Sequence, residues 1–109
     1  MEENVAVEAL SALAHPTRLK AFRLLVQEGP NGLTAGDIAH RVAVPPSTLS
    51  THLALLQRAG LLSARRLDRR IFYAADYEGT RRLLSFLTED CCQGRPEICG
   101  ALAETIRVC

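Results

Sequence analysis

The sequence predicts an α+β fold that is mainly helical and carries one β-hairpin. Two observations lead to this expectation. Residues 34–59 read as a short helix, a proline-marked turn and a second helix with small polar side chains on its outer side, which is the helix-turn-helix arrangement. Residues 61–75 follow as two β-prone runs around a polar tip, which predicts a hairpin. Together they describe a winged helix-turn-helix with a two-stranded β-hairpin wing.

Length and composition favour a single ordinary domain. The 109 residues can bury a modest core and would gain from a partner chain. An apolar fraction of 48% and a charged fraction of 23% are typical of globular proteins. No run approaches the roughly 18 apolar residues of a membrane helix, and the acidic N-terminus is unlike a signal peptide. We therefore expect a cytoplasmic protein without a membrane partner, in which thiols stay reduced.

Two helices are expected before residue 30. Residues 5–14 are apolar almost all round. Such a helix needs burial on more than one side, which favours packing against a second copy of the chain. Pro16 can open the next helix at its first position, and Gly29-Pro30 ends it.

The helix-turn-helix pair begins at residues 34–37, where TAGD resembles a capping box with Asp in place of Glu or Gln. The short helix runs to about Val42, and Pro45-Pro46 marks the turn. Over residues 47–59, leucines recur at i, i+4 and i+7, which predicts a buried stripe. Small hydroxyl side chains on the other side would let the backbone approach a major groove and hydrogen-bond to base edges. These candidates are Ser47, Thr48, Ser50 and Thr51.

The hairpin region is strongly basic. Residues 58–82 hold seven arginines against three acidic residues, although the whole chain has a formal net charge of only +1. Arginine makes planar, bidentate contacts with phosphates and base edges, so this bias favours nucleic acid. The hairpin would lie along a DNA backbone or reach a minor groove, adding affinity that falls steeply with salt. The arginines expected there are Arg65, Arg66, Arg69 and Arg70.

A plainer interpretation of the same pattern stays open. The two helices could belong to an α+β domain whose serines and threonines simply face water, and a serine-rich helix start is also ordinary capping. In that case the winged helix is a protein-interaction module. Reversing the charge of the hairpin would then change no DNA affinity, because there would be none to lose.

Three stretches resemble a known family. LSALAHPTRLKAFRLL, STLSTHLALLQRAGLL and the hairpin ending RRIFYAA are similar to the winged-helix ArsR/SmtB family of metal-responsive repressors. The resemblance covers roughly residues 6–90, and the second stretch is its most specific part. It implies a homodimer joined through the first and last long helices, with two recognition helices in successive major grooves of double-stranded operator DNA. We therefore expect residues 1–90 to form the DNA-binding and dimerisation domain.

The resemblance adds His52 to the four hydroxyl residues as a DNA-contacting candidate. His52 lies nearer the core edge than they do, so a structural role is the alternative. The family's wing often carries a glycine at its tip, whereas the tip here reads LDRR, which leaves the turn type open. The last helix is expected over residues 77–90, with its leucines on one face.

The signal that such a regulator senses depends on its ligand site. Members of the family place sensing sites differently: one site uses cysteines in the helix before the recognition helix, and another uses Asp and His along the last helix. Residues 35–42 contain no cysteine, and no histidine follows His52, so neither site is expected. The remaining candidates lie in residues 91–109, which we expect to be a cysteine-containing C-terminal metalloid-binding segment. They are Cys91, Cys92 and Cys99.

Three thiolates suit a soft, pyramidal ion. Thiolates select soft acceptors, and an S₃ site fits trivalent arsenic or antimony, As(III) or Sb(III), whose lone pair takes the fourth direction. Zinc usually requires four tetrahedral ligands. Cys91 and Cys92 have Cα atoms about 3.8 Å apart, closer than the roughly 4.4–6.8 Å of disulfides, so one bridging atom fits them better than an S–S bond. The loop 93–98 can bring Cys99 back, and cysteines just after the last helix occur in some arsenic-responsive members of the family.

Other uses of these thiols stay open. A disulfide from Cys99 to Cys91 or Cys92 would make a redox switch, and a single cysteine is often a buried or incidental residue. If Cys109 is a fourth thiolate, cadmium, lead or zinc return as candidates. A methylated arsenical needs only two thiolates, and the site can lie within one chain or be shared between subunits.

Catalysis is not expected. Arsenate reductases and low-molecular-weight phosphatases place an arginine six positions after a cysteine in a phosphate-cradling loop, and positions 97 and 98 are Glu and Ile here. His15, His40 and His52 form no obvious triad or metal-hydrolase spacing. The sequence therefore predicts a repressor without catalytic residues or a catalytic cofactor, released from its operator when As(III) or Sb(III) binds the three cysteines.

Overall fold

The computed structural model describes residues 1–88. Residues 89–109 lie outside the described part, and with them the predicted end of the last helix at Asp90 and the candidate ligands Cys91, Cys92 and Cys99. The elements of the described chain confirm the predicted α+β, mainly helical fold. In chain order they are α1 (Glu3–Leu13), α2 (Pro16–Glu28), β1 (Leu33–Thr34), α3 (Ala35–Val42), α4 (Pro46–Arg58), β2 (Leu62–Leu67), β3 (Arg70–Ala75) and α5 (Tyr77–Thr88).

The predicted hairpin is present, and a short third strand joins it. β2 pairs with β3 antiparallel, from Leu62 opposite Ala75 to Leu67 opposite Arg70. β1 pairs with the other edge of β3, so the strand order is β1-β3-β2. The sequence pattern does not predict β1 because a strand of two residues is too short to show an alternation of apolar and polar side chains.

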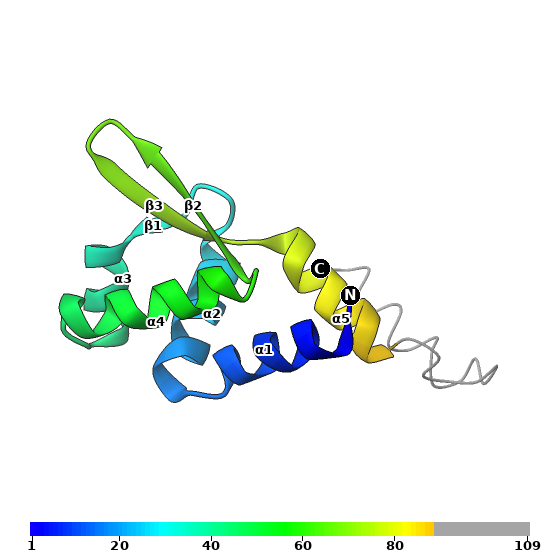
Figure 1. Ribbon diagram of the computed structural model, residues 1–109. Coiled ribbons are helices and arrows are strands. Elements are labelled where there is room, and N and C mark those ends of the chain that lie inside the picture. The colour runs from blue at the N-terminus through cyan, green and yellow to red at the C-terminus, as the bar shows by residue number, and fades with distance from the viewer. Residues whose placement is uncertain (89–109) are drawn as a thin grey trace.

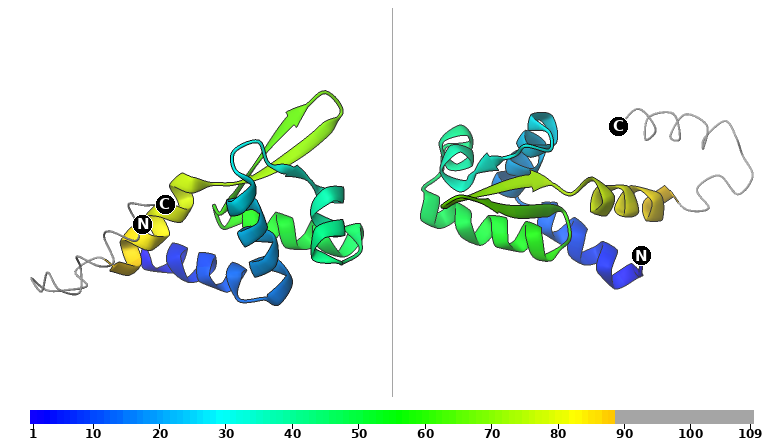
Figure 2. Two further views of the ribbon diagram at one scale, coloured as in Figure 1. Left: turned by 180° about the vertical axis from the view of Figure 1, so that it is seen from behind. Right: turned by 90° about the horizontal axis from the view of Figure 1, so that it is seen from above.

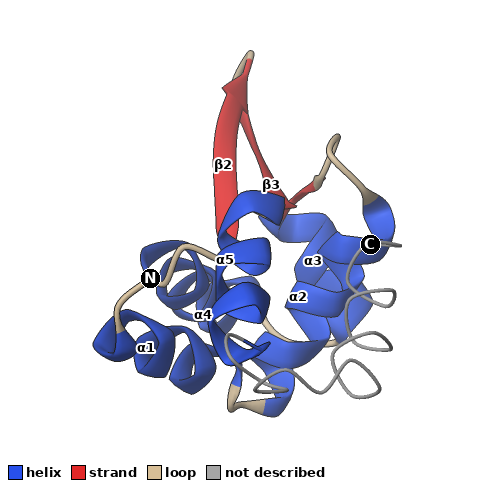
Figure 3. Cartoon of the chain, turned by 90° about the vertical axis from the view of Figure 1, so that its right-hand side faces the viewer, coloured by secondary structure: helices blue, strands red, loops and turns tan. Residues whose placement is uncertain are grey.

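The helices form one body, and the hairpin projects from it. Figure 1 shows α1 and α5 at one end of the described chain, and α3 with the N-terminal end of α4 at the other end. The views from behind and from above agree (Figure 2). In Figure 3 the base of the β2–β3 hairpin meets the helices, while its tip stands clear of them. Most of the hairpin is therefore accessible to a large partner.

The leucine stripe of α4 anchors this helix in the core, as predicted. Leu49, Leu53 and Leu56 are each at most 1% exposed. They belong to one buried cluster with Leu25 of α2 and Ile38 of α3. Burying a leucine side chain stabilises a fold by roughly 1.5–3 kcal/mol. The stripe therefore fixes which face of α4 points outward.

The turn between α3 and α4 follows from its local sequence. The Thr34 hydroxyl accepts a hydrogen bond from the Asp37 amide at 3.2 Å, so Thr34 caps α3 as predicted. No return bond from the Asp37 side chain is found within the described residues, so half of the capping box forms. Ala43 ends α3 in the left-handed region, with a φ of 59°. Pro46 then opens α4 in its first turn, where a missing amide hydrogen costs nothing.

α1 has two apolar faces, as its composition predicts. Its inner face is made of alanines in the core, whereas Val5, Val7 and Leu10 are 42%, 59% and 42% exposed. α5 buries Leu83 but leaves Leu87 49% exposed. Since α1 and α5 lie at the same end of the described chain (Figure 1), both helices that expose apolar side chains are found at that end. Apolar surface of this kind is suited to a protein–protein contact.

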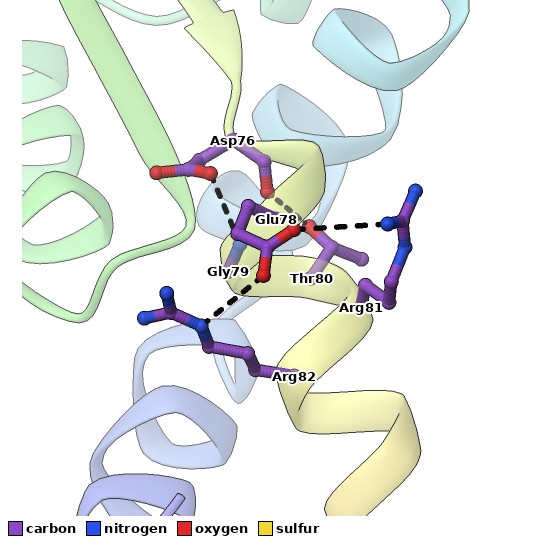
Figure 4. Close-up of polar contacts among 6 residues, drawn as sticks. All are labelled: Asp76, Glu78, Gly79, Thr80, Arg81 and Arg82. Atoms are coloured by element: carbon purple, nitrogen blue, oxygen red, sulfur yellow. Dashed lines mark hydrogen bonds and ion pairs between the residues drawn. The ribbon is translucent and has the colours of Figure 1, made fainter.

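Asp76 connects the wing to α5 (Figure 4). Its amide donates to the Leu61 carbonyl at 2.9 Å, and its carboxylate accepts from the Gly79 amide at 3.0 Å. Its own carbonyl accepts from the Thr80 hydroxyl at 2.8 Å. Gly79 lies so close to Gly60 that an added Cβ would overlap the Gly60 carbonyl oxygen. These contacts therefore fix the position of the start of α5 relative to the wing and to the residues that follow α4.

Candidate nucleic-acid interface

The outer face of α4 carries four exposed hydroxyl groups, away from the buried leucines. Ser47, Thr48, Ser50 and Thr51 are all exposed. The Ser50 hydroxyl lies 3.5 Å from the Ser47 carbonyl, which is a weak hydrogen bond. The other three hydroxyls bond no partner in the part of the chain that the structure describes. Because a hydroxyl is small and both donates and accepts, this face can approach a groove closely and bond to base edges.

His52 differs from these four residues. Its ring is half-buried, and its Nδ1 lies 3.1 Å from a guanidinium nitrogen of Arg18 on α2. The ring of His15, which caps α2, lies 4.5 Å away between centroids. Burial lowers the pKa of His52 from its ordinary value of 6.5, and the neighbouring His15 and Arg18 lower it further. This arrangement favours the structural role that was the alternative for His52.

The tip of the wing is a two-residue turn made without glycine. Leu67 pairs with Arg70, so Asp68 and Arg69 form the loop. Asp68 adopts a φ of 58°, in the left-handed region that aspartate tolerates better than most residues. Asp68 therefore takes the backbone conformation that a glycine at the tip would otherwise supply.

The four predicted wing arginines are all exposed, but they differ in their contacts. Arg65 donates to the Asn31 carbonyl at 3.1 Å. The guanidinium of Arg70 lies 5.2 Å from the centre of the Phe72 ring, which is a cation–π contact. Arg66 and Arg69 have no hydrogen bond or ion pair to any described residue. These two side chains are therefore the most available for a phosphate.

Positive charge on the wing is not neutralised within residues 1–88. The ion pairs found there join Glu78 to Arg81 and Arg82 on α5, at 3.7 and 3.4 Å (Figure 4). Asp68 is the one acidic residue between β2 and the end of β3. The wing and the N-terminal half of α4 lie toward the same side in Figures 1 and 2. The wing carries the free cations and this half of α4 carries the small hydroxyls, a combination that suits a polyanion with base edges exposed in its grooves.

The described part of the chain shows neither a metal site nor a membrane-spanning helix. No group of three or more His, Cys, Asp or Glu side chains within residues 1–88 could hold a metal ion. Asp76, the start of the Asp and His pattern that marks one known sensing site, instead caps α5. No described helix is long and apolar enough to cross a membrane.

The fold and the chemistry of this face define a winged helix-turn-helix protein. A helix-turn-helix domain family matches residues 13–63. The nodulation protein NolR of Rhizobium meliloti is 33% identical over 88 residues, which cover 81% of this chain and 70% of NolR. The transcriptional activator HlyU of Vibrio cholerae is 33% identical over 95 residues, which cover 85% of each protein.

Solved structures share the fold. An ArsR-like transcriptional regulator from Rhodococcus has a TM-score of 0.73 at 21% identity, covering 90% of both chains. The homodimeric winged helix-turn-helix domain of a possible ArsR-family regulator from Mycobacterium bovis has a TM-score of 0.65 at 24% identity. The match covers 80% of this chain and 81% of that domain. A possible transcriptional regulator for arsenical resistance has a TM-score of 0.64 at 29% identity, and the match covers 73% of this chain and 80% of that protein. Reduced HlyU from Vibrio cholerae has a TM-score of 0.62 at 32% identity, and the match covers 77% of this chain and 88% of HlyU.

This chain belongs to the ArsR family of winged helix-turn-helix transcriptional regulators. The predicted family is thereby confirmed. The related proteins include a nodulation protein and a transcriptional activator, so they support the class of regulator rather than one signal. Because the relatives are transcriptional regulators, the prediction that the protein is not an enzyme is also confirmed.

Two features of this region are missed by sequence reasoning. The contact between Arg18 and His52 joins residues far apart in the chain, and a pairwise contact of this kind leaves no periodic signal in one sequence. The cap formed by Asp76 was detectable, because Asp76 stands three residues before Gly79 at the start of an apolar helical stripe.

Proposed function

We propose that this regulator is a homodimeric repressor that binds double-stranded operator DNA and leaves it when As(III) or Sb(III) binds its C-terminal cysteines. The observation that carries the DNA-binding part is the exposed hydroxyl face of α4 beside a wing with free arginines. The protein acts in the cytoplasm, where its operator lies.

In this proposal α4 enters the major groove with its hydroxyl face toward the bases. Ser47, Thr48, Ser50 and Thr51 read base edges, and the buried leucines hold the helix in register behind them. Arg66 and Arg69 reach phosphates or the minor groove, while Arg65 holds the wing against Asn31 and Arg70 lies over Phe72 within the wing itself. DNA affinity then comes mostly from the wing, and sequence preference comes from α4.

The exposed apolar side chains of α1 and α5 support the homodimer. Val5, Val7 and Leu10 on α1 and Leu87 on α5 stay 42–59% exposed among residues 1–88. The Mycobacterium bovis domain of the same fold is homodimeric. A two-fold dimer through this end leaves both α4 helices free, and such dimers place them about one DNA turn, roughly 34 Å, apart.

Removing two hydroxyls from α4 should reduce sequence preference. We expect Thr48→Ala with Thr51→Ala to weaken binding to the preferred duplex about tenfold, because two hydrogen bonds to base edges are removed. Binding to unrelated duplex should stay the same, since the phosphate contacts remain. Fluorescence anisotropy on both duplexes measures this, with Ser85→Ala on α5 as the matched hydroxyl control. Equal weakening on the two duplexes would show that this face does not read bases.

The effector part of the proposal is supported by cysteine placement. All four cysteines of the chain follow residue 88, and three of them lie in the nine-residue span 91–99. Soft thiolates are the ligands that trivalent arsenic and antimony prefer. The similarity to a possible transcriptional regulator for arsenical resistance, at 29% identity, points in the same direction. Cys91, Cys92 and Cys99 would hold the ion in an S₃ site.

Release of DNA follows from linkage between the two sites. A metalloid that fixes the chain just after α5 would favour a dimer geometry in which the two α4 helices no longer match successive major grooves. Reciprocity requires DNA to weaken metalloid binding by the same factor. The size of the effect equals the difference in metalloid affinity between the two dimer geometries.

A thiol-redox regulator is the second candidate. It is favoured by the same cysteines and by the similarity to HlyU, whose structure is known in a reduced state. In that case Cys99 forms a disulfide with Cys91 or Cys92. Hydrogen peroxide would then release the protein from DNA while arsenite under reducing conditions would not, and the opposite pattern supports the metalloid site.

A further inference from the structure

We propose that Arg18 is a positioning residue for DNA binding, which ties α1 to the recognition helix α4 through a neutral His52, so that operator affinity falls when His52 gains a proton. This inference rests on the proposed role of α4 in reading DNA. It concerns residues that make no contact with DNA themselves.

Arg18 joins three helices through one planar group. It stands in the first turn of α2, and its Nε donates to the Ala12 carbonyl at 2.6 Å. Ala12 lies in the last turn of α1, where carbonyls have no partner in their own helix and the helix end attracts a cation. A terminal nitrogen of the same guanidinium lies 3.1 Å from His52 Nδ1 on α4. The end of α1 and the middle of α4 are thus held by the two edges of one rigid fork.

This geometry requires an uncharged His52. A guanidinium only donates hydrogen bonds, so Nδ1 must supply a lone pair and the proton of the neutral ring must sit on Nε2. An imidazolium has no lone pair to offer. It would also bring a second positive charge to Arg18 at hydrogen-bond distance.

The surroundings would not compensate that charge. His15 caps α2 by accepting from the Thr17 amide, and its ring lies 4.5 Å from that of His52. Glu8 of α1 and Arg58 of α4 line a hollow together with Arg18. No ion pair connects a carboxylate to Arg18 or His52 among residues 1–88, and the exposed His40 and Arg41 of α3 make no bond to the ring there. The same burial and neighbours lower the pKa of His52 below 6.5.

The consequence for DNA binding follows from the position of His52 on α4. His52 follows Thr51 directly and lies one turn after Thr48, two of the exposed hydroxyl residues. Hydrogen bonds to bases tolerate only a few tenths of an ångström, so releasing this side of α4 weakens them. Above pH 6.5 His52 is neutral and affinity is full; affinity falls as the pH drops through the lowered pKa. Stability changes with the same sign, because the unfolded chain takes up the proton more readily.

The connection also gives α1 a route to α4. Since α1 carries exposed apolar residues expected at the dimer contact, a shift of α1 moves the Ala12 carbonyl that orients Arg18. Arg18 then transmits this shift to His52. A change of dimer geometry can therefore alter the outer face of α4 without any movement of the core leucines.

The test compares four variants with wild type on a labelled duplex by fluorescence anisotropy between about pH 8 and pH 5.5. Wild type should lose affinity as the pH falls below 6.5, because a protonated His52 can no longer accept the hydrogen bond from Arg18. His52→Asn keeps an acceptor near the Nδ1 position and cannot be protonated, so its affinity should match wild type at pH 8 and vary less with pH. His52→Leu and Arg18→Met should bind about tenfold more weakly at pH 8. His40→Asn, the control, should behave as wild type.

Three results would overturn the inference. The first is a full pH response in His52→Asn, and the second is wild-type affinity in Arg18→Met. The third is an equal decrease of affinity at every pH in His52→Asn, as a direct DNA contact would require. Circular dichroism checks that each variant is folded.

A second measurement and a separate outcome complete the test. If Arg18→Met does not fold, the tautomer of His52 in wild type decides, because nitrogen NMR at pH 8 must show the proton on Nε2. Failure of wild type to bind any duplex at pH 8 would instead refute the proposed function itself.

Discussion

Reversing the charge of the two free wing arginines should nearly abolish operator binding. In Arg66→Glu with Arg69→Glu, two phosphate contacts are replaced by two repulsive ones, so we expect affinity to fall by about 100-fold or more near physiological salt. The logarithm of the binding constant should also depend less steeply on the logarithm of salt concentration, by roughly one unit for each arginine removed from a phosphate. Anisotropy titrations over a series of salt concentrations measure both quantities.

A control must change net charge equally at another site. Lys20→Glu with Arg23→Glu serves, because both residues are exposed on α2 and belong neither to the wing nor to α4. This variant should bind within a fewfold of wild type. If the two double variants weaken binding equally, net charge rather than the wing controls binding. If neither variant differs from wild type because wild type itself binds no duplex, the domain is a protein-interaction module.

Placing a methyl group on Gly79 should strongly destabilise the fold. In Gly79→Ala the new Cβ overlaps the Gly60 carbonyl oxygen, and that oxygen belongs to the backbone, so the chain itself must move. Forced overpacking of this kind costs about 1–3 kcal/mol or more. Alanine is the better helix former by roughly 1 kcal/mol, but the clash outweighs that gain. Thermal and denaturant unfolding followed by circular dichroism measure the change.

Gly36→Ala is the matched control for this substitution. Gly36 also lies in the first turn of a helix, and an added Cβ meets nothing within 4 Å. Its stability should equal or slightly exceed that of wild type. Because Gly79 fixes where α5 leaves the wing, folded Gly79→Ala should also bind operator more weakly. Equal stability of the two variants would contradict the close packing of Gly79 on Gly60.

The fold could be predicted in most of its elements because each carries a local signal. The leucines at 49, 53 and 56 repeat with helical spacing, and burial of that stripe determines which side chains of α4 face outward. Prolines and glycines mark the helix ends at chemically understandable places. Two β-prone runs around a short polar tip indicate the hairpin, and Asp68 takes the unusual backbone angle that a glycine would otherwise supply.

The remaining features depend on contacts across the chain. β1 exists because β3 has a free edge to which Leu33 and Thr34 can pair, and the position of Arg18 over His52 depends on how α1, α2 and α4 pack. The difference among the wing arginines arises in the same way, since Asn31 and Phe72 engage two of them. One sequence contains no pairwise information of this kind. Composition identified the wing arginines as a group, but it could not show which of them are free to contact a phosphate.

The central claim is that metalloid binding at the C-terminal cysteines releases a regulator whose α4 and wing hold operator DNA. The most direct measurement is fluorescence anisotropy of the reduced protein on a labelled duplex from upstream of its own gene, with arsenite titrated in. Wild type and Cys109→Ser should be released, whereas Cys91→Ser and Cys99→Ser should stay bound. Retention of wild type on DNA at saturating arsenite, or full release of both Cys91→Ser and Cys99→Ser, would contradict this mechanism.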